Sequence, residues 1–267
     1  MGQVRSAGSE FLAGLRLLGR GFARYGSNPK LLLLGAIPAV VTCALFAVGW
    51  VFLISYIDEI ASAVTWFADD WSAGWRRLVE FGAGAGILVV AALISALTFT
   101  AITLLIGDPF YEAISERIED GLGGTPGVVD LPWYRTLWPS LVDSIRLIAL
   151  GIALAIPLFL LGFVPVVGQT VVPVLNAIGG GWLIAVELTG IPFNRRGLRL
   201  RDRRRILRAH RPMALGFGIP VFLMLLVPLA AIIVVPAAVV GGTLLTRRAF
   251  GLHIGEEPAS APHAVTR

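Results

Sequence analysis

The stretch of sequence that decides the fold is the charge-free run Leu147–Val186, with FVPVVGQTVVP at its centre (residues 163–173). A membrane-spanning helix needs about 20 consecutive apolar residues, so this run is long enough for two passes. Pro157, Pro165 and Pro173 argue against one unbroken helix, because a proline inside a helix removes a backbone hydrogen bond and clashes with the preceding turn. The run therefore predicts a helical hairpin in a membrane.

Three polar or small residues, Gly168, Gln169 and Thr170, lie at the predicted bend. Irregular backbone at membrane depth must be buried in protein or line a cavity, because lipid offers no hydrogen-bond partners. These residues are therefore either the tip of a hairpin or part of a polar path through the membrane.

Three other runs also lack charged side chains. Leu31–Ile57 and Phe81–Gly107 have 27 residues each, long enough to span the membrane with some tilt. Pro212–Thr246 has 35 residues and contains Pro220, Pro228 and Pro236, and we expect it to form two pieces of about 15 residues, short of the ~20 that a full crossing needs. We expect two full transmembrane helices and two helical hairpins that penetrate only half of the bilayer.

The composition agrees with a membrane protein. Hydrophobic residues make up 56% of the chain and charged residues 15%, with a mean hydropathy of +0.81. The sequence predicts an all-α, polytopic integral membrane protein of the inner (plasma) membrane. We expect residues 1–250 to form a single membrane domain and residues 251–267 to be a disordered cytoplasmic tail.

The N-terminal segment Glu10–Tyr25 has the pattern of an amphipathic helix. Arginines recur at every fourth position, and an apolar stripe at helical spacing lies opposite them. The arginines are Arg16, Arg20 and Arg24, and the stripe is Phe11, Leu15, Leu18 and Phe22. Such a segment is not a cleavable signal peptide, and we expect it to lie in the membrane interface.

The arginines also predict the orientation. Residues 1–30 carry five basic side chains and residues 195–211 carry nine arginines, whereas the loop at 58–80 has five acidic residues against two arginines. Cytoplasmic loops of membrane proteins are enriched in Lys and Arg. Both termini and the 195–211 loop are therefore predicted to be cytoplasmic. The net charge of +5 is thus a topology signal that also attracts anionic lipid, and we expect no nucleic-acid partner.

The most informative motif runs from Gly107 to Glu119. Asp108 is a good N-cap and the proline after it suits the first helical position, so a new helix is predicted to begin there. Three carboxylates then fall on one helical face: Glu112, Glu116 and Glu119. The basic residues considered as their partners are Arg117, Arg135 and Arg146.

Two interpretations of this acidic face stay open. It is either a solvated cytoplasmic helix, or a charged network at a pore mouth in which Glu116 and Arg117 meet copies from neighbouring subunits.

At these residues the chain resembles the CysZ-type sulfate permeases, part of the etoposide-induced membrane protein superfamily. DPF at 108–110 followed by SERIE at 115–119, PVVGQTVVPVL at 165–175 and IPF at 191–193 resemble three ordered blocks of that family. The resemblance covers nearly the whole chain and marks it as an arginine-rich bacterial member. It implies two spans, two half-penetrating hairpins, oligomeric assembly and sulfate uptake feeding cysteine synthesis, without an ATP-binding subunit.

The chain departs from the family at the start of its first span. The family's sulfate-binding PGLRR aligns with Pro29–Leu33, which places Leu32 and Leu33 where the family has arginines. Lys30 is the cation that remains there, and Asn28 with the N–H groups of the following helix could supply a weaker anion site. Tyr111 also replaces an asparagine of the family.

Enzyme chemistry finds no support in the sequence. The three histidines lie in the basic loop and the C-terminal tail, with no catalytic triad, HExxH motif or P-loop, and we expect no cofactor and no metal. Two classes of function remain. The first is an anion permease in which Asn28 and Lys30 receive the anion while Glu116 and Arg117 gate or select it. The second is a membrane scaffold or envelope-assembly protein that has the same fold without transport.

Overall fold

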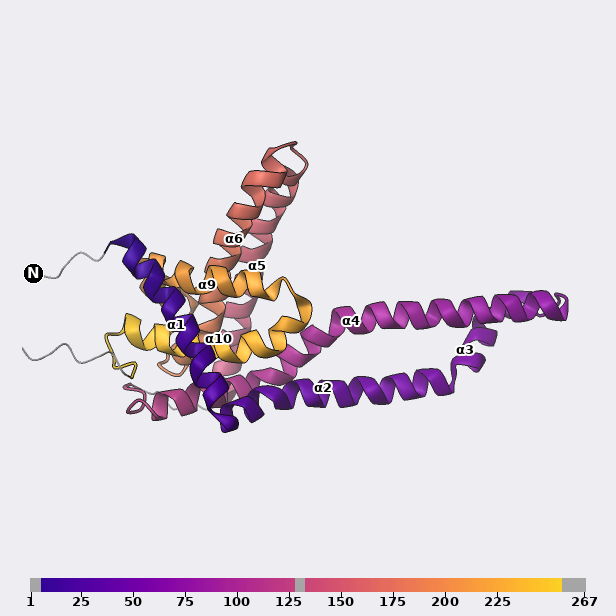
Figure 1. Ribbon diagram of the computed structural model, residues 1–267, viewed down its shortest axis with the longest axis horizontal. Coiled ribbons are helices and arrows are strands. Elements are labelled where there is room, and N and C mark those ends of the chain that lie inside the picture. Colours follow the sequence, from indigo (N-terminus) through magenta and orange to yellow (C-terminus); the bar gives the residue numbers. More distant parts are fainter. Residues whose placement is uncertain (1–5, 128–132, 256–267) are drawn as a thin grey trace, which may run out of the picture. The chain divides into compact units, whose positions relative to one another are not determined.

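The computed structural model describes residues 6–127 and 133–255, and over these residues the chain is helical with connecting turns (Figure 1). This confirms the all-α, polytopic fold class, because five of the described helices are long and apolar enough to cross a membrane. The helices are α1 Ala7–Ser27, α2 Pro29–Ser55, α3 Ile57–Val64, η1 Trp66–Ala68, α4 Ala73–Asp120, α5 Trp133–Gly162, α6 Val167–Leu188, α7 Gly190–Asn194, α8 Leu200–Ala209, α9 Arg211–Leu225, η2 Pro228–Ala230 and α10 Ala231–Ala249.

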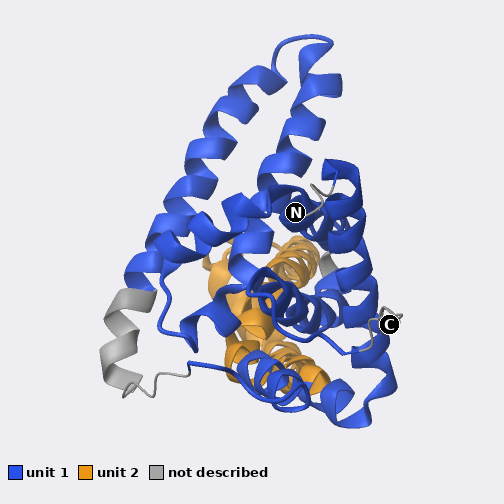
Figure 2. Ribbon diagram, turned by 90° about the vertical axis from the view of Figure 1, so that its left-hand side faces the viewer, with its two compact units in different colours: residues 1–34, 111–267 blue, residues 35–110 orange. Residues whose placement is uncertain are grey.

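The chain divides into two compact units (Figure 2). Unit 1 comprises residues 1–34 and 111–267, and unit 2 comprises residues 35–110. Both boundaries fall inside long helices, α2 and α4, which pass from one unit into the other.

Unit 2 is a pair of apolar helical segments joined by the short helices α3 and η1. The segments of α2 and α4 lie side by side, and the rings of Phe46 and Phe99 meet edge to face at 5.6 Å. Most of their apolar side chains face outward, and Leu97 is 79% exposed. Contiguous apolar surface of this extent is covered by lipid in a membrane protein. The two transmembrane helices are thus where the charge-free runs predicted them.

At the centre of unit 1 lies α10, and α1 packs across both α9 and α10. The predicted amphipathic N-terminal helix is present, but its buried stripe differs from the predicted one: Ala13, Gly14, Leu17, Leu18, Gly21 and Tyr25 are buried, and Leu15 is exposed. The small residues explain the difference. A Cβ atom on Gly14 would overlap the carbonyl oxygen of Met213, so glycine lets the two backbones approach closely.

The first predicted hairpin is confirmed as a bend between two helices. The helix α5 ends at Gly162, residues 163–166 form the turn, and α6 begins at Val167 (Figure 1). Val166 has a φ of 68°, a conformation that costs a β-branched residue energy. The apolar parts of both helices are 22 residues long, about 33 Å at 1.5 Å per residue. This length also permits a full crossing, so half penetration stays a prediction.

The second hairpin consists of α9 and α10, joined by a short turn and η2. With 15 residues, α9 is about 22 Å long, below the ~30 Å thickness of the bilayer core. The length of α9 agrees with the expected pieces of about 15 residues, whereas α10 has 19 residues and is long enough to cross the membrane.

The C-terminal segment corrects one expectation. Residues 251–255, predicted as part of a disordered tail, are held against the rest of unit 1. The Arg24 side chain donates to the Ile254 carbonyl at 3.1 Å, and Ile254 is 6% exposed. A buried apolar side chain and a charged donor fix this segment in a way that its composition does not indicate. Residues 256–267 lie outside the described residues.

Two glycines on α1 provide a matched test of the close packing. A Cβ on Gly21 would lie 2.6 Å from the Ala237 carbonyl oxygen, whereas a Cβ on Gly19 would meet nothing within 4 Å. Gly21→Ala should therefore lower the free energy of unfolding by about 1–3 kcal/mol. Gly19→Ala should raise it by about 0.5–1 kcal/mol, because alanine favours the helix. Thermal unfolding in detergent measures both, and equal effects would contradict the packing of α1 on α10.

The depth of the first hairpin can be tested by cysteine labelling. In a chain with Cys43→Ala, Val166→Cys at the α5–α6 turn should resist a membrane-impermeant thiol reagent added from the outer face. Asp69→Cys lies in the 58–80 loop, which we expect outside because it is poor in basic residues, and it should react fully. Equal labelling of both sites from outside would mean that α5 and α6 cross the whole bilayer.

Candidate functional site

The centre of the candidate site is the carboxylate of Glu119, near the C-terminal end of α4. Its side chain is 0% exposed and meets two arginines. Arg196 Nη2 lies 2.7 Å from Oε1, and Arg195 Nη1 lies 3.3 Å from Oε2. Removing an ionised carboxylate from solvent is costly unless cations compensate it, so these two contacts are what allow Glu119 to be buried.

Arg195 extends the cluster towards the surface. Its Nη2 atom donates to Glu116 Oε1 at 3.1 Å, and the Glu116 side chain is 54% exposed. One guanidinium thus joins a buried carboxylate to an exposed one. We call Glu116, Glu119, Arg195 and Arg196 the α4 charge cluster.

The short helix α7 positions the two arginines. It contains the sequence IPF at 191–193, and Phe193 is fully buried. Arg196 donates from Nη1 to the Pro192 carbonyl at 2.6 Å, and its guanidinium carbon lies 5.4 Å from the centre of the Phe250 ring. The apolar block therefore anchors the chain, and Arg196 is oriented by the Pro192 carbonyl of the preceding helix and by a cation–π contact.

A turn that follows α4 closes over the cluster. The Thr125 hydroxyl donates to Glu119 Oε2, and the Gly124 N–H donates to the Glu119 carbonyl at 2.9 Å. Arg247, 3% exposed, donates to the carbonyls of Gly124 and Leu122 at 2.6 Å each, and to that of His253 at 2.8 Å. This arginine on α10 therefore fastens both the turn and the C-terminal segment.

The structure corrects two expectations about α4. No helix begins at Asp108: α4 runs without a break from Ala73 to Asp120 with Pro109 inside it. A proline removes one backbone N–H and need not end a helix whose other hydrogen bonds remain. Asp108 is exposed.

The partners of the acidic face also differ from those considered. Glu119 and Glu116 pair with Arg195 and Arg196 rather than with Arg117 or Arg146. Arg117 is exposed, and Arg146 lies 3.7 Å from Asp143. The side chain of Arg135 lies outside the described residues.

The three predicted acidic positions thus have different surroundings. Glu112 is exposed, as a solvated face requires, Glu116 is half-exposed in an ion pair, and Glu119 is buried. The sequence correctly placed them on one helix, and the burial of the last of them follows from tertiary contacts.

Of the two proposed anion-binding residues, Asn28 lies between α1 and α2 and Lys30 lies in the first turn of α2, and both are exposed. Asn28 Oδ1 accepts a hydrogen bond from the Lys30 N–H at 3.0 Å, and the Asn28 carbonyl accepts from Leu31 and Leu32 at 3.0 Å each. The first N–H groups of α2 are therefore used within the chain, and the exposed ammonium of Lys30 is the group that can meet an anion. Leu31 is 1% exposed and belongs to the core.

Gly168, Gln169 and Thr170 form the first turn of α6, directly after the α5–α6 bend. A Cβ on Gly168 would overlap the Gly162 carbonyl, so glycine allows the helices to meet there. The Thr170 hydroxyl donates to the Val166 carbonyl at 2.7 Å, and Gln169 is exposed. Their position beside the bend fits the hairpin-tip interpretation.

Arg203 on α8 is a second buried arginine that the sequence did not single out. It donates to the Val186 carbonyl at 2.8 Å and to Asn194 Oδ1 at 3.3 Å. Burial lowers its pKa, and the negative charges of Glu187 and Asp143 oppose that shift. The available signal was its spacing, because it shares one helical face with the buried Leu200 and Leu207.

Removal of a cation from the α4 charge cluster should be costly. Arg196→Met leaves Glu119 buried with one partner fewer, which should lower the free energy of unfolding by about 3–5 kcal/mol. Arg205→Met, on the exposed face of α8, should change it by less than about 1 kcal/mol. Unfolding in detergent compares the two variants. Indistinguishable stabilities would show that the cluster does not hold α7 to α4.

Comparison with known proteins identifies the family to which the chain belongs. A model of the family described as "Sulfate transporter CysZ/Etoposide-induced protein 2.4" matches residues 17–236. The chain is 27% identical over 232 residues to the sulfate transporter CysZ of Pseudomonas fluorescens strain Pf0-1, a match that covers 84% of this chain and 89% of that protein. It is 27% identical over 244 residues to the sulfate transporter CysZ of Pectobacterium atrosepticum, covering 91% and 84%.

The counterpart in Pseudomonas paraeruginosa strain PA7, also named sulfate transporter CysZ, is 27% identical over 243 residues, covering 90% of this chain and 96% of that protein. With its apolar helices, the protein is a multi-pass protein of the inner membrane. The chain belongs to the sulfate transporter CysZ/etoposide-induced protein 2.4 family.

Proposed function

We propose that the protein carries sulfate across the inner membrane. The observation that carries this proposal is the family match over residues 17–236, together with three bacterial relatives named sulfate transporter CysZ that align along most of their length. We further propose that the protein works as a homo-oligomer in contact with membrane lipid, with both termini and the 195–211 loop in the cytoplasm, and that it catalyses no reaction and needs no cofactor.

The first contact with the anion is assigned to Lys30, supported by Asn28. Sulfate is a dianion that loses strongly bound water on entering a protein, so charge-assisted donors must replace that water. The Lys30 ammonium is exposed at the start of α2, and the Asn28 side chain fixes the backbone there. The lysine ammonium is a point charge, whereas an arginine guanidinium offers two parallel N–H donors. This site should therefore bind sulfate more weakly than a site with the family's two arginines.

The α4 charge cluster is assigned to selection or gating. The Arg195 guanidinium contacts Glu116 at the surface, where an arriving sulfate competes with a carboxylate for the same donors. When the Arg195–Glu116 ion pair is broken, the Glu116 carboxylate repels anions. Entry of sulfate therefore requires Arg195 to exchange Glu116 for the anion. In an oligomer, the exposed Arg117 and Glu112 are the neighbouring charges of α4 that another subunit can meet.

A second function, membrane scaffolding or envelope assembly without transport, is favoured by one observation. Leu31, in the segment that aligns with the family's sulfate site, is buried in the core of unit 1 at 1% exposure. The following residue, Leu32, stands where the family has an arginine and is 40% exposed. A protein that no longer binds anions would retain the packing of Leu31 in the core and the helical hairpins.

Uptake of radiolabelled sulfate into liposomes containing the purified protein separates the two functions. The wild type should exceed empty liposomes, and Lys30→Met should lower the initial rate at least ~10-fold at low sulfate, because a charge-assisted contact is typically worth 1.5–3 kcal/mol. Lys30→Arg should retain uptake, since it keeps the charge and adds a fork.

Leu32→Arg with Leu33→Arg restores the family pattern at two exposed positions and should raise the apparent affinity. Arg16→Met, which removes an exposed cation from α1, is the control and should leave uptake unchanged. Wild-type uptake equal to that of empty liposomes would reject transport and leave the scaffold function.

A further inference from the structure

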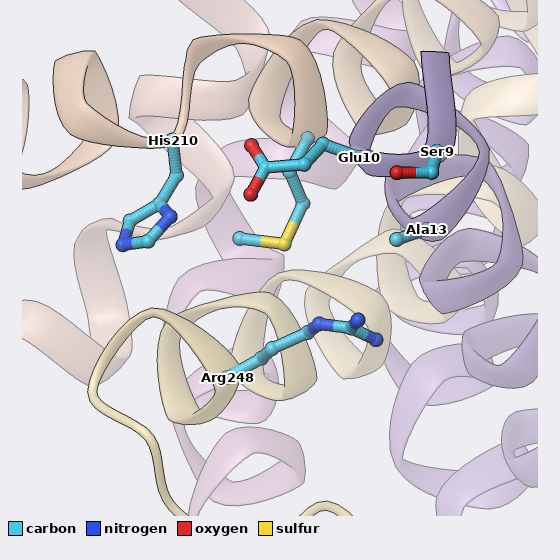
Figure 3. Close-up of a pocket in the computed structure, with 6 residues that line it drawn as sticks. Ser9, Glu10, Ala13, His210 and Arg248 are labelled. Atoms are coloured by element: carbon cyan, nitrogen blue, oxygen red, sulfur yellow. The ribbon is translucent and has the colours of Figure 1, made fainter. Parts of the chain in front are cut away.

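A small cavity in unit 1 lies apart from every residue assigned above. Its volume is about 100 Å³, and it is enclosed by the first turns of α1, the junction of α8 with α9, and the last turn of α10 (Figure 3). The residues that line it are Ser9, Glu10, Ala13, His210, Met213 and Arg248.

Opposite charges face this cavity without a direct ion pair between them. Glu10 comes from α1 and Arg248 from α10, and no salt bridge joins Glu10 to Arg248 or to His210, three residues that the structure describes. Figure 3 shows the Glu10 carboxylate extending to the His210 side of the space, while the Arg248 guanidinium extends from the opposite helix to the Ala13 side. All three side chains are partly buried, so a ligand between them would be shielded from part of the solvent.

The arrangement of charges selects among ligands. A simple anion would be attracted by Arg248 and repelled by Glu10. A simple cation would be attracted by Glu10 and repelled by Arg248. A ligand carrying both charges satisfies both groups, because its carboxylate can accept two hydrogen bonds from the guanidinium fork while its ammonium donates to the carboxylate.

The walls add a limit on size. Ala13 and Met213 are 7% and 3% exposed and give the cavity an apolar side, whereas Ser9 and His210 offer hydrogen-bonding groups. A volume of about 100 Å³ corresponds to roughly three water molecules at ~30 Å³ each. That space suits a compact molecule with few carbon atoms.

We propose that this cavity binds a small zwitterion of the α-amino acid class, the size of glycine or alanine. Arg248 holds its carboxylate, Glu10 holds its ammonium group, and Ser9 and His210 supply secondary hydrogen bonds. The ligand would bridge α1 and α10, two helices that already pack together at Gly21 and Gly241. By the distribution of arginines, the cavity opens on the cytoplasmic side, so it samples cytoplasmic molecules.

The direct test is equilibrium dialysis of radiolabelled glycine against the purified full-length protein. Binding should be saturable, and L-alanine should displace glycine at a similar concentration. Three compounds should displace glycine only at concentrations at least ~10-fold higher than alanine, the factor that 1.4 kcal/mol produces. They are acetate and methylammonium, which each carry one of the two charges, and L-tryptophan, which is too large. Absence of saturable binding would overturn the proposal, and displacement by acetate as effective as that by alanine would overturn it in favour of a plain anion site.

Variants assign the binding to the cavity. Glu10→Gln and Arg248→Gln should each weaken glycine binding at least ~10-fold, since a charged partner is lost in each. Arg16→Gln, an exposed residue of α1 outside the cavity, should bind like the wild type. If Arg248→Gln does not fold, Arg248→Lys keeps the charge without the fork and should still weaken binding measurably. Wild-type affinity in folded Glu10→Gln protein would overturn the assignment.

Discussion

The buried carboxylate of Glu119 is the constraint on which the arrangement of unit 1 depends. An ionised group with no exposed surface is tolerated only when cations and hydrogen bonds replace its water. Arg195 and Arg196 provide the cations, and they follow directly from α7, whose apolar residues are packed in the core. The end of α4 and the α7–α8 connection must therefore come together, although 76 residues separate Glu119 from Arg195.

The same cluster places a usable charge at the surface. Its burial decreases from Glu119, which is fully enclosed, to Glu116, which is half-exposed and shares Arg195 with it. Arg195 is held by the buried carboxylate, so the exposed ion pair is already oriented; under the proposed function this would reduce the entropy lost when an anion binds. Arg247 supports this arrangement from α10 by fixing the turn that covers the cluster.

Much of the fold was predictable because it depends on local properties of the chain. The absence of charge over Leu147–Val186 and the prolines within it predicted a hairpin, and the structure bends at residues 163–166. The periodicity of the N-terminal segment predicted a helix, but not which face is buried, because close approach at Gly14 and Gly21 depends on the partners α9 and α10. The same limit applies at Pro109, where tertiary structure maintains a helix that local rules would end.

The site was predictable only in part for a related reason. Helical spacing placed three carboxylates on one face, but spacing cannot identify a partner that comes from elsewhere in the chain. The IPF block at 191–193 is a recognisable motif, whereas the arginines directly after it indicate only the topology when the sequence is taken alone. Their role became visible once the distances to Glu119 were known.

A double-mutant cycle between Glu119 and Arg196 tests this account most directly. Glu119→Gln, Arg196→Met and the combined variant would be compared with the wild type by reversible unfolding in detergent. If the buried pair holds α7 to α4, the double variant should be more stable than the sum of the single effects predicts, with a coupling free energy of about 1–3 kcal/mol. Additive effects would contradict the account, because they would mean that the two side chains, 2.7 Å apart, contribute independently.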